Sequence, residues 1–510
     1  MVTLDGSALS LADVVAVARD GVPVAVSEVA RERMRPAREL VERIDAAGDV
    51  VYGVTTGFGA LADRAIAAGD RSSLQTAVVR SHAAGMGPPL PAEVVRGMML
   101  LRARTLCAGY SGVRPALVDG MVGLLNASVV PWVPAMGSLG ASGDLAPLAH
   151  CALLLLGEGF AVGASGERVD GGSALAASGL SPLAVGPKEG LALINGTDAM
   201  CAALALCVWD LAALLVAADA VCAMSVEALL GTARAFDADI VALRPSAGVA
   251  AAAANLRALL ADSPLVASHV ASHHAVQDAY SLRCAPQVHG AARDVLAFAR
   301  GVVETELDSV VDNPLVMVGR GEVVSSGNFH GAALAYAADM CASLCADVAA
   351  ISERRVDRLL DPARSRGLPA FLTREPGVNS GLMIAQYTAA SCVTALRSAA
   401  VPVAAQSVPV SAGQEDHVSM GWNACLRTRA SVEDLRRVLS VEAVCAAQAL
   451  DLRAPLRPGP GTGALLASLR ARVPALEADR ELASDLEAAC SWLSSGAWRM
   501  ALDAASVALS

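Results

Sequence analysis

The chain has 510 residues, of which 54% are hydrophobic, 17% charged and 3% aromatic. This balance excludes an intrinsically disordered protein, because disorder requires low hydrophobicity and a high density of charge. The formal net charge of −11 argues against a surface that follows nucleic-acid phosphates, so we expect no nucleic-acid partner. The length allows about three domains or one large enzyme domain, and a core of Ala, Val and Leu with few rings suits closely packed helices.

The cysteines and the apolar stretches indicate the cellular compartment in which the protein is expected. The 12 cysteines are scattered from Cys107 to Cys490 without a Cys-x-x-Cys pair, and the first residues lack a basic start followed by an apolar run. We therefore expect free, buried thiols in a reducing cytoplasm. The most apolar stretch, residues 200–224, is interrupted by Asp210 and Asp219. This pattern predicts a buried helix of a soluble assembly and no transmembrane span.

The first half of the chain alternates helices with glycine-rich segments. Apolar residues at helical spacing predict a helix over Val26–Ile44, and Gly48 supplies a stop. Residues 50–59 then carry three glycines within seven positions, which predicts a loop with unusual backbone angles or mobility. Further along, Asp144 is placed to cap the helix that follows it, with Pro147 tolerated in the first turn.

The second half predicts long helices. Residues 158–190 are rich in Gly and Ser and predict short hairpins or loops. After them the clearest helical stripe runs from about 334 to 360, where Asp361 and a following proline end it. Residues 457–463 are rich in Pro and Gly and predict a linker before a last helical segment. We therefore expect a mainly α fold built as a bundle of long helices.

The most informative segment is the glycine-rich turn that contains Ala141-Ser142-Gly143. A simple helix entry is the ordinary interpretation of such a turn. A hydrolase nucleophile elbow would need Gly-x-Ser-x-Gly after a strand, and a phosphate loop would need Gly-Lys-Ser or Gly-Lys-Thr, so both fit poorly. A third possibility is that the tripeptide cyclises, with the Gly143 nitrogen attacking the Ala141 carbonyl carbon. Loss of water, including the Ser142 hydroxyl, would leave an electrophilic methylidene on a five-membered imidazolone. Glycine suits the attacking position because it lacks a Cβ.

Ala141-Ser142-Gly143 within GSLGASGDLAPLAH resembles the self-processing triad of the aromatic amino acid ammonia-lyases and aminomutases, which carry the methylideneimidazolone (MIO) cofactor. The resemblance extends over nearly the whole chain. Further segments match the family in order: YGVTTGFG at 52–59, SHAAGMG at 81–87, GLALINGT at 190–197, QDAYSLRCAPQ at 277–287, DNPL at 312–315, GNFHG at 327–331 and QEDHVSMG at 414–421.

The resemblance implies catalytic and positioning roles for several residues. Tyr52 would lie on a mobile lid that closes over the substrate and would remove a β-proton from the substrate. Its site would have to favour the phenolate. Asn195 would hold the cofactor ring while also capping the helix that follows it. Arg283 would bind the substrate carboxylate. Tyr280 would assist amine transfer, and its spacing of three from Arg283 would place both on one face of a helix or tight turn. Without the resemblance, a surface Tyr and a structural Arg would be the simpler interpretations.

Two positions bear on the substrate. His82 matches family members that act on histidine, and Glu415 stands where phenylalanine-specific plant enzymes carry Gln. A carboxylate suits an imidazole, which donates a hydrogen bond or carries a proton, but would be an unpaired charge beside a phenyl ring. The resemblance also assigns Gln277 and Phe329 to the substrate pocket, whereas His330 is expected to be structural. Each of these residues alone also has a purely structural interpretation.

Other potential cofactor ligands are few. His269 and His273 have the i, i+4 spacing of a metal pair, but no His-Glu-x-x-His accompanies them, so a structural role is expected for them and for His274. Lys188 is the only lysine, so any lysine Schiff base would depend on it. We expect no metal and no external cofactor, since the implied MIO group forms from Ala141, Ser142 and Gly143.

The resemblance implies elimination of ammonia from L-histidine to give trans-urocanate. It also implies a core of long helices like that of the fumarase and aspartase enzymes. Residues 1–195 would form a smaller N-terminal part with the lid loop and the turn, and residues 196–510 the long-helix core and a C-terminal helical segment. The family implies a homotetramer whose active sites are shared between subunits. Alternatives are an aminomutase, a tyrosine or phenylalanine ammonia-lyase and, from another class, a helical scaffold whose turn never cyclises.

Overall fold

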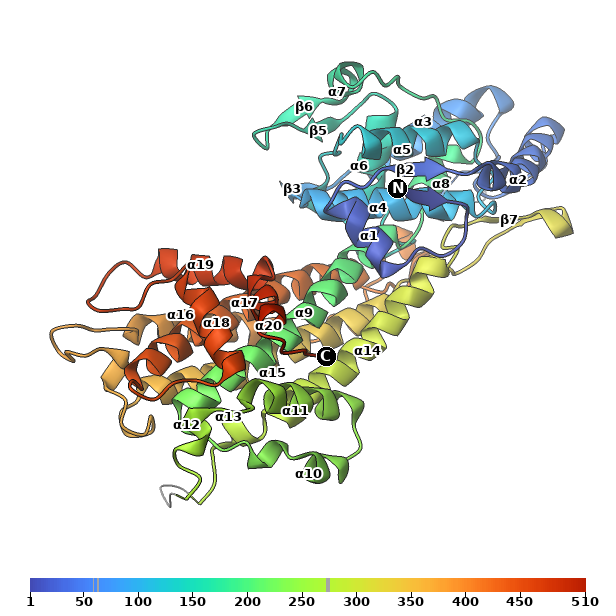
Figure 1. Cartoon of the computed structure of the whole chain (residues 1–510). Coiled ribbons are helices and arrows are strands. Elements are labelled where there is room, and N and C mark those ends of the chain that lie inside the picture. The colour runs from blue at the N-terminus through green and yellow to red at the C-terminus, as the bar shows by residue number, and fades with distance from the viewer. Residues whose placement is uncertain (58, 62–63, 272–275) are drawn as a thin grey trace. The chain divides into compact units, whose positions relative to one another are not determined.

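The computed structural model describes every residue except 58, 62–63 and 272–275. Helices dominate these described residues (Figure 1), which confirms the predicted mainly α fold. They group into two compact units, each assembled from three stretches of chain. Unit 1 comprises Met1–Trp209, Arg300–Asp339 and Pro402–Leu426, and unit 2 comprises Asp210–Ala299, Met340–Val401 and Arg427–Ser510. The single division expected at residue 195 is not one of these five boundaries, four of which fall inside long helices.

Unit 1 combines short and medium helices with all of the strands that the described residues form. Its helices are α1 (Leu11–Ala18), α2 (Glu28–Ala47), α3 (Arg71–His82), α4 (Ala92–Cys107), α5 (Pro115–Asn126), α6 (Leu145–Leu155), α7 (Gly171–Ala177) and α8 (Glu189–Ile194). Its single turns of 3-10 helix are η1 (Gly59–Leu61), η2 (Ala68–Asp70), η4 (Val318–Arg320) and η6 (Ser411–Gly413).

The strands of unit 1 form four two-stranded ladders. They pair β1 (Val2–Leu4) with β2 (Val24–Val26), β3 (Met86–Pro89) with β4 (Pro134–Met136), β5 (Phe160–Val162) with β6 (Arg168–Asp170), and β7 (Leu315–Met317) with β8 (Glu322–Val324). The first ladder is parallel, in the register Val2 to Val24, and the other three are antiparallel. The β5–β6 hairpin and α7 occupy the segment predicted to hold short hairpins or loops.

The regular elements of unit 2 are all helices among its described residues. Unit 2 contains α10 (Ala238–Ala242), α11 (Ala247–Leu260), α12 (Pro264–Ala267), α13 (Tyr280–Arg283), α16 (Met383–Ala399), α18 (Pro460–Arg470), α19 (Ala483–Ser494), α20 (Ala497–Ala504), η3 (Arg234–Phe236) and η5 (Ala370–Leu372). The segment expected to be a linker at 457–463 is partly helical, since α18 begins at Pro460. Proline is tolerated in the first turn of a helix, because the backbone N–H groups there make no hydrogen bond within the helix.

Four of the five boundaries between the units lie inside long helices: α9 (Asp198–Ala228), α14 (Ala285–Asp308), α15 (Ala332–Leu360) and α17 (Gly421–Leu452). By length and hydropathy alone, α9 and α15 could cross a membrane, but 78% and 61% of their most apolar stretches are buried in the protein. Burial on this scale is typical of the core helices of large globular proteins. The 12 cysteines are free and most of them are buried, as expected.

Two of the predicted helix features are found in the structure, and one predicted helix cap is not. Gly48 ends α2 in the left-handed conformation at φ 75°, which glycine adopts without a steric penalty. The predicted helix at 334–360 is confirmed as α15. Asp144 stands at the N-cap of α6, but its side chain does not cap the helix. Its carboxylate instead accepts a hydrogen bond from the backbone N–H of Met200 at 2.8 Å.

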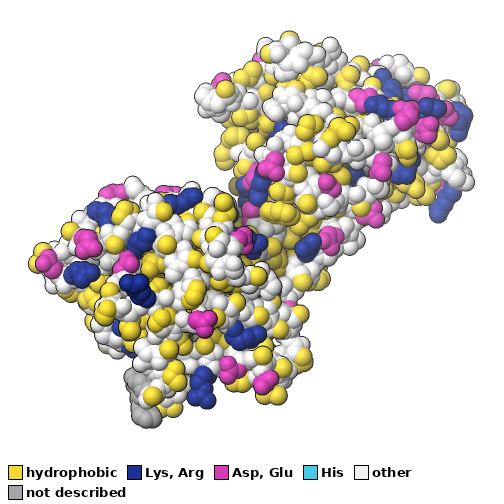
Figure 2. All heavy atoms as spheres, in the orientation of Figure 1, with side chains coloured by type: hydrophobic (Ala, Val, Ile, Leu, Met, Phe, Trp, Pro, Cys, Tyr) yellow, Lys and Arg dark blue, Asp and Glu magenta, His cyan; other side chains and the backbone are white. Residues whose placement is uncertain are grey.

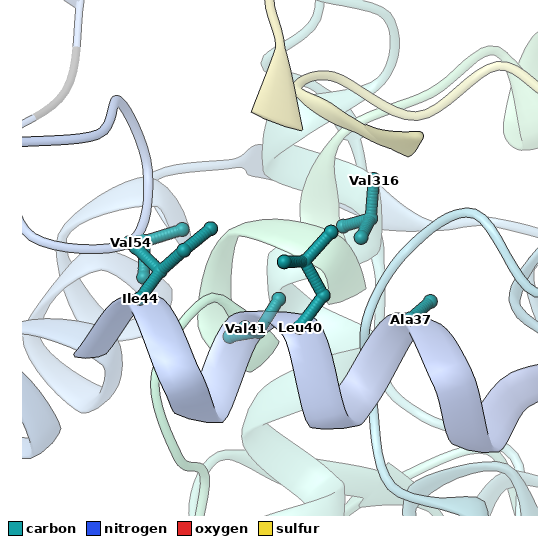
Figure 3. Close-up of a cluster of buried hydrophobic side chains, with 6 residues drawn as sticks. All are labelled: Ala37, Leu40, Val41, Ile44, Val54 and Val316. Carbon is teal, nitrogen blue, oxygen red and sulfur yellow. The ribbon is translucent and has the colours of Figure 1, made fainter. Parts of the chain in front are cut away.

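A core cluster in unit 1 anchors the loop that carries Tyr52. Figure 3 shows one face of α2 presenting apolar side chains to Val54 and to Val316 of β7. The α2 members of this cluster are Ala37, Leu40, Val41 and Ile44. Because Val54 is completely buried there, the backbone two residues from Tyr52 is fixed to α2. Figure 2 shows basic and acidic side chains interspersed over the face that it draws.

Candidate active site

The turn before α6 has a tightly bent backbone. Gly140, Ser142 and Gly143 have positive φ angles of 72°, 52° and 79°. For Ser142 this left-handed conformation is unfavourable, because its Cβ approaches the following carbonyl oxygen. Local strain of this kind persists only where the surroundings hold it in place. The turn therefore has a conformation in which the chain doubles back between Ala141 and Gly143.

Gly196 holds the turn in place. Gly143 and Gly196 form a parallel bridge, and the N–H of Asp144 donates to the carbonyl oxygen of Gly196 at 2.7 Å. A Cβ atom at Gly143 would lie 2.1 Å from that oxygen, which no real side chain tolerates. Glycine is thus required at 143 for close approach as well as for its positive φ.

Two other Ala-Ser-Gly tripeptides in the chain lack these features. Residues 164–166 lie in the exposed β5–β6 turn and residues 177–179 lie at the end of α7, where Ser178 has a φ of −99°. The only positive φ in each is that of its glycine, Gly166 or Gly179, and an added Cβ at either glycine would meet nothing within 4 Å. The tripeptide sequence alone therefore does not create the bent, clamped geometry found at Ser142.

Three of the predicted site residues gather around Ser142 in unit 1. The hydroxyl of Ser142 donates to Oε1 of Glu415 at 3.2 Å. The charge of Glu415 acts on both Tyr52 and His82: it adds to the rise in the pKa of Tyr52 and opposes the fall in the pKa of His82. Both side chains therefore lie near the Glu415 carboxylate. The structure thus brings together the Ser142 hydroxyl, a phenol, an imidazole and a carboxylate.

Burial is the largest influence on the pKa of Tyr52 and on the pKa of His82. It raises the pKa of Tyr52 above its ordinary value, and the N–H of Gly59, 3.5 Å from the hydroxyl, opposes this only in part. The expectation that Tyr52 sits among groups favouring phenolate is wrong for these described contacts, since Glu415 adds negative charge. Burial also lowers the pKa of His82, whose Nδ1 lies 2.8 Å from the carbonyl oxygen of Val78. His82 is therefore mainly neutral at neutral pH.

Asn195 enters this region from the end of α8. Its side-chain Nδ2 donates to the carbonyl oxygen of Asn313 at 2.7 Å. The expected capping of the helix that follows is not found, because the side-chain oxygen accepts no N–H of the described backbone. Oδ1 of Asn195 is buried and has no hydrogen-bond partner among the described residues. Asn195 therefore presents a free acceptor beside the turn held by Gly196. Leaving a buried acceptor without a donor costs free energy, which a bound group with a donor would recover. Asn313 was missed as a functional position, although it lies in the quoted DNPL segment.

A second buried group of polar residues supports the turn. Asp144 is fully buried, and this burial raises its pKa to about 8, with the nearby Asp198 adding to the effect. Arg102 and Asp198 form a buried ion pair at 3.4 Å, and Arg102 also donates to the carbonyl oxygen of Asn195. Single-sequence patterns could not identify these residues, because an Arg or Asp in a helix usually faces solvent.

The remaining predicted residues divide between the two units. Phe329 is half-buried in unit 1, and its neighbour His330 stacks on His417 at 5.8 Å, which supports the expected structural role of His330. In unit 2, Gln277 and Arg283 line a hollow of about 510 Å³.

Arg283 and Tyr280 share one face of α13, as predicted. The guanidinium carbon of Arg283 lies 4.5 Å from the centre of the Tyr280 ring. The Nε of Arg283 donates to the carbonyl oxygen of Asp278 at 2.9 Å, which fixes the direction of the side chain. The ring of Tyr280 is 70% exposed, an unusual situation for a large aromatic side chain.

The histidine cluster gives no metal site among the described residues. His269 lies with its Nε2 3.0 Å from the carbonyl oxygen of Gly231, consistent with the structural role predicted for it. His273 and His274 lie outside the described residues.

The protein combines a mainly helical fold with a clamped Ala-Ser-Gly turn that lies near a phenol, an imidazole and a carboxylate. Comparison with known proteins supplies the family. A model of the aromatic amino acid lyase family matches residues 9–471. The chain therefore belongs to the aromatic amino acid lyase family.

Individual relatives cover nearly all of the chain. A histidine ammonia-lyase of Streptomyces coelicolor is 50% identical over 496 residues, which are 97% of each protein. The crystal structure of histidine ammonia-lyase from Trypanosoma cruzi superposes with a TM-score of 0.90 at 38% identity, covering 99% of this chain and 95% of that one. The crystal structure of a tyrosine aminomutase from Streptomyces globisporus gives a TM-score of 0.92 at 35% identity, covering 99% and 98%. The fold is thus common to family members that differ in substrate and in reaction.

Proposed function

We propose that the protein eliminates ammonia from L-histidine to give trans-urocanate, using an MIO electrophile formed from Ala141-Ser142-Gly143. The observation that carries this proposal is the position of Glu415, whose Oε1 accepts a hydrogen bond from the Ser142 hydroxyl at 3.2 Å and whose charge acts on His82. A carboxylate and a neutral imidazole beside the electrophile suit a substrate imidazole, which needs hydrogen-bond partners of both kinds. The 50% identity to a histidine ammonia-lyase supports the same substrate.

The residues of the open turn suit MIO formation. The Gly143 nitrogen would bond to the Ala141 carbonyl carbon, and the carbonyl oxygen would leave as water with the amide hydrogens of Ser142 and Gly143. The Ser142 hydroxyl would leave as a second water with the hydrogen on its own Cα. The left-handed backbone at Ser142 and Gly143, and the unpartnered Oδ1 of Asn195, are the features of the structure that fit such a group.

Once formed, MIO would supply an electrophilic carbon that takes up the substrate amine and makes it a better leaving group. The phenolate form of Tyr52 accepts the β-proton and becomes the neutral phenol. Arg283 binds the substrate carboxylate through its planar guanidinium, and Tyr280 assists amine release. His82 and Glu415 hold the imidazole, Asn195 contacts the ring, and Gln277 and Phe329 complete the substrate pocket.

The assembly we propose is a cytoplasmic homotetramer with shared active sites and no external cofactor. Large aromatic side chains are exposed on the long helices and on α13, which favours burial against further copies of the chain. These side chains include Trp209, Phe298, Tyr336, Tyr387 and Tyr280. Light scattering after size-exclusion chromatography tests this assembly, and a monomeric active enzyme would contradict it.

The test of the function is incubation of the purified enzyme with histidine, tyrosine and phenylalanine, followed by chromatography of the products. Urocanate from histidine as the main product supports the proposal. A β-amino acid would identify an aminomutase, a reaction favoured by the close superposition on tyrosine aminomutase. Cinnamate-type products would identify a tyrosine or phenylalanine lyase. An intact mass that retains both waters in inactive protein would identify a helical scaffold.

A further inference from the structure

The only lysine of the chain is committed to a buried ion pair. Nζ of Lys188 donates to Oδ2 of Asp312 at 2.7 Å, and both side chains are completely shielded from solvent. Burial lowers the pKa of Lys188, while Asp312 opposes this change. Neither residue belongs to the reaction proposed above, so the pair needs another explanation.

Stability is a poor explanation for such a pair. Desolvation of two charges offsets most of their attraction, and apolar replacements of similar volume are often neutral or stabilising. Buried pairs are better attested as devices that fix the position of the elements they join. The elements joined by Lys188 and Asp312 therefore matter more than the pair's own free energy.

The two ends of α8 are bound to two adjacent residues, Asp312 and Asn313. Lys188 is the N-cap of α8, with φ 65°, and binds Asp312. Asn195 is the C-cap of α8, and its Nδ2 donates to the carbonyl oxygen of Asn313 at 2.7 Å. Oδ1 of Asp312 accepts from the N–H of Asn313 at 2.8 Å, which orients that peptide. The segment at 312–313 thus fixes both the start and the end of α8.

The end of α8 continues directly into the clamp on the turn. Gly196, the residue after Asn195, bridges Gly143 and accepts from the N–H of Asp144 at 2.7 Å. Movement of α8 along its axis would carry Gly196 away from Gly143. A misplacement of about 1 Å reduces an intramolecular reaction by roughly 100-fold, because the reacting atoms leave their near-attack geometry.

We infer that Lys188 and Asp312 are positioning residues for the self-cyclisation of Ala141-Ser142-Gly143. This inference rests on the proposed MIO chemistry and deepens it. The ion pair fixes α8, α8 fixes Asn195 and Gly196, and Gly196 holds Gly143 where its nitrogen reaches the Ala141 carbonyl carbon. The pair acts through this chain of contacts and touches neither substrate nor the reacting atoms.

The experiment follows cyclisation by intact mass in a cell-free synthesis reaction sampled over time. Lys188→Met and Asp312→Asn keep side-chain size and remove one charge each. We expect cyclisation about tenfold slower or more in both variants. Asp219→Asn is the matched control, because Asp219 is also fully buried and binds His289 and Arg293 at 2.7 Å. This control should lose thermal stability and still cyclise at the wild-type rate.

The double variant Lys188→Met/Asp312→Asn separates positioning from stability. It contains no uncompensated buried charge, so we expect its melting temperature to recover relative to the single variants while cyclisation stays slow. Wild-type cyclisation rates in folded Lys188→Met and Asp312→Asn would overturn the inference. So would cyclisation that recovers in step with the melting temperature. A wild-type protein that never loses two waters would instead overturn the proposed function itself.

Discussion

The hydroxyl of Ser142 donates a hydrogen bond to Oε1 of Glu415 at 3.2 Å, across 273 residues of sequence. The same carboxylate contributes to the pKa of Tyr52 and of His82. Glu415 is therefore the residue that connects the proposed electrophile, the proposed base and the proposed imidazole contact. Its contact with the Ser142 hydroxyl belongs to the open turn, before the hydroxyl is lost.

The first prediction concerns which serine is lost. Ser142→Ala should never undergo the second loss of water, because the variant lacks the hydroxyl and its methyl cannot become a methylidene by dehydration. Its kcat should therefore fall by about 1000-fold or more. Ser165→Ala and Ser178→Ala are matched controls from the other two Ala-Ser-Gly tripeptides. Both controls should cyclise and turn over histidine normally. Peptide mapping that finds the mass loss at 164–166 or 177–179 would refute the assignment.

The second prediction concerns substrate choice. Glu415→Gln should lower kcat/KM for histidine by about 100-fold, because a charge-assisted contact to the imidazole is lost. The residual activity with phenylalanine should change far less, since a phenyl ring offers the carboxylate nothing to bind. Glu322→Gln is a suitable control, because Glu322 lies in β8 and pairs with exposed Arg320 at 3.5 Å. The intact mass of Glu415→Gln must be measured alongside, so that slow maturation is not mistaken for weak binding. Equal losses for both substrates would contradict a role in imidazole recognition.

The sequence predicted the helical fold and the Ala-Ser-Gly turn because both depend on local patterns. Apolar periodicity located α15, and Gly48 located the end of α2, since each feature is encoded within a few residues. The role of Asp144 was not predictable, because its partner Met200 comes from a later helix. The pair of Lys188 and Asp312 was missed for the same reason. Burial of a charged side chain depends on packing between distant segments, which spacing along the chain does not encode.

The third prediction concerns the pH dependence of catalysis. The pKa of Tyr52 is raised, so the fraction of phenolate and with it kcat/KM should rise with pH by up to about tenfold per unit through neutrality. The pKa of His82 is lowered from 6.5, so the neutral imidazole should be lost only in more acidic solution. Tyr52→Phe should lower kcat by about 100-fold or more and remove the alkaline rise. A pH profile of Tyr52→Phe parallel to that of the wild type would exclude Tyr52 as the base.

The fourth prediction concerns stability. The pKa of Asp144 is raised from 3.8 to about 8 in the folded protein, so between these values the folded state holds a proton that the unfolded state releases. The free energy of unfolding should therefore fall as pH rises through this window, by at most about 1.4 kcal/mol per unit. Asp144→Asn cannot ionise, so its stability relative to the wild type should improve from about pH 5 to about pH 8. Urea denaturation at both pH values measures this difference, and parallel curves for the two proteins would disprove it.

The fifth prediction separates backbone strain from steric exclusion at the turn. Gly143 and Gly166 have similar positive φ angles of 79° and 85°, but only Gly143 would place a Cβ 2.1 Å from the carbonyl oxygen of Gly196. Gly166→Ala should cost about 1 kcal/mol of stability from its left-handed backbone and leave cyclisation intact. Gly143→Ala must in addition push Gly196 away, so we expect a loss of about 3 kcal/mol and almost no cyclised protein. Thermal unfolding and intact mass check the two effects separately. A Gly143→Ala protein that cyclises as fast as Gly166→Ala would show that the contact with Gly196 does not control the reaction.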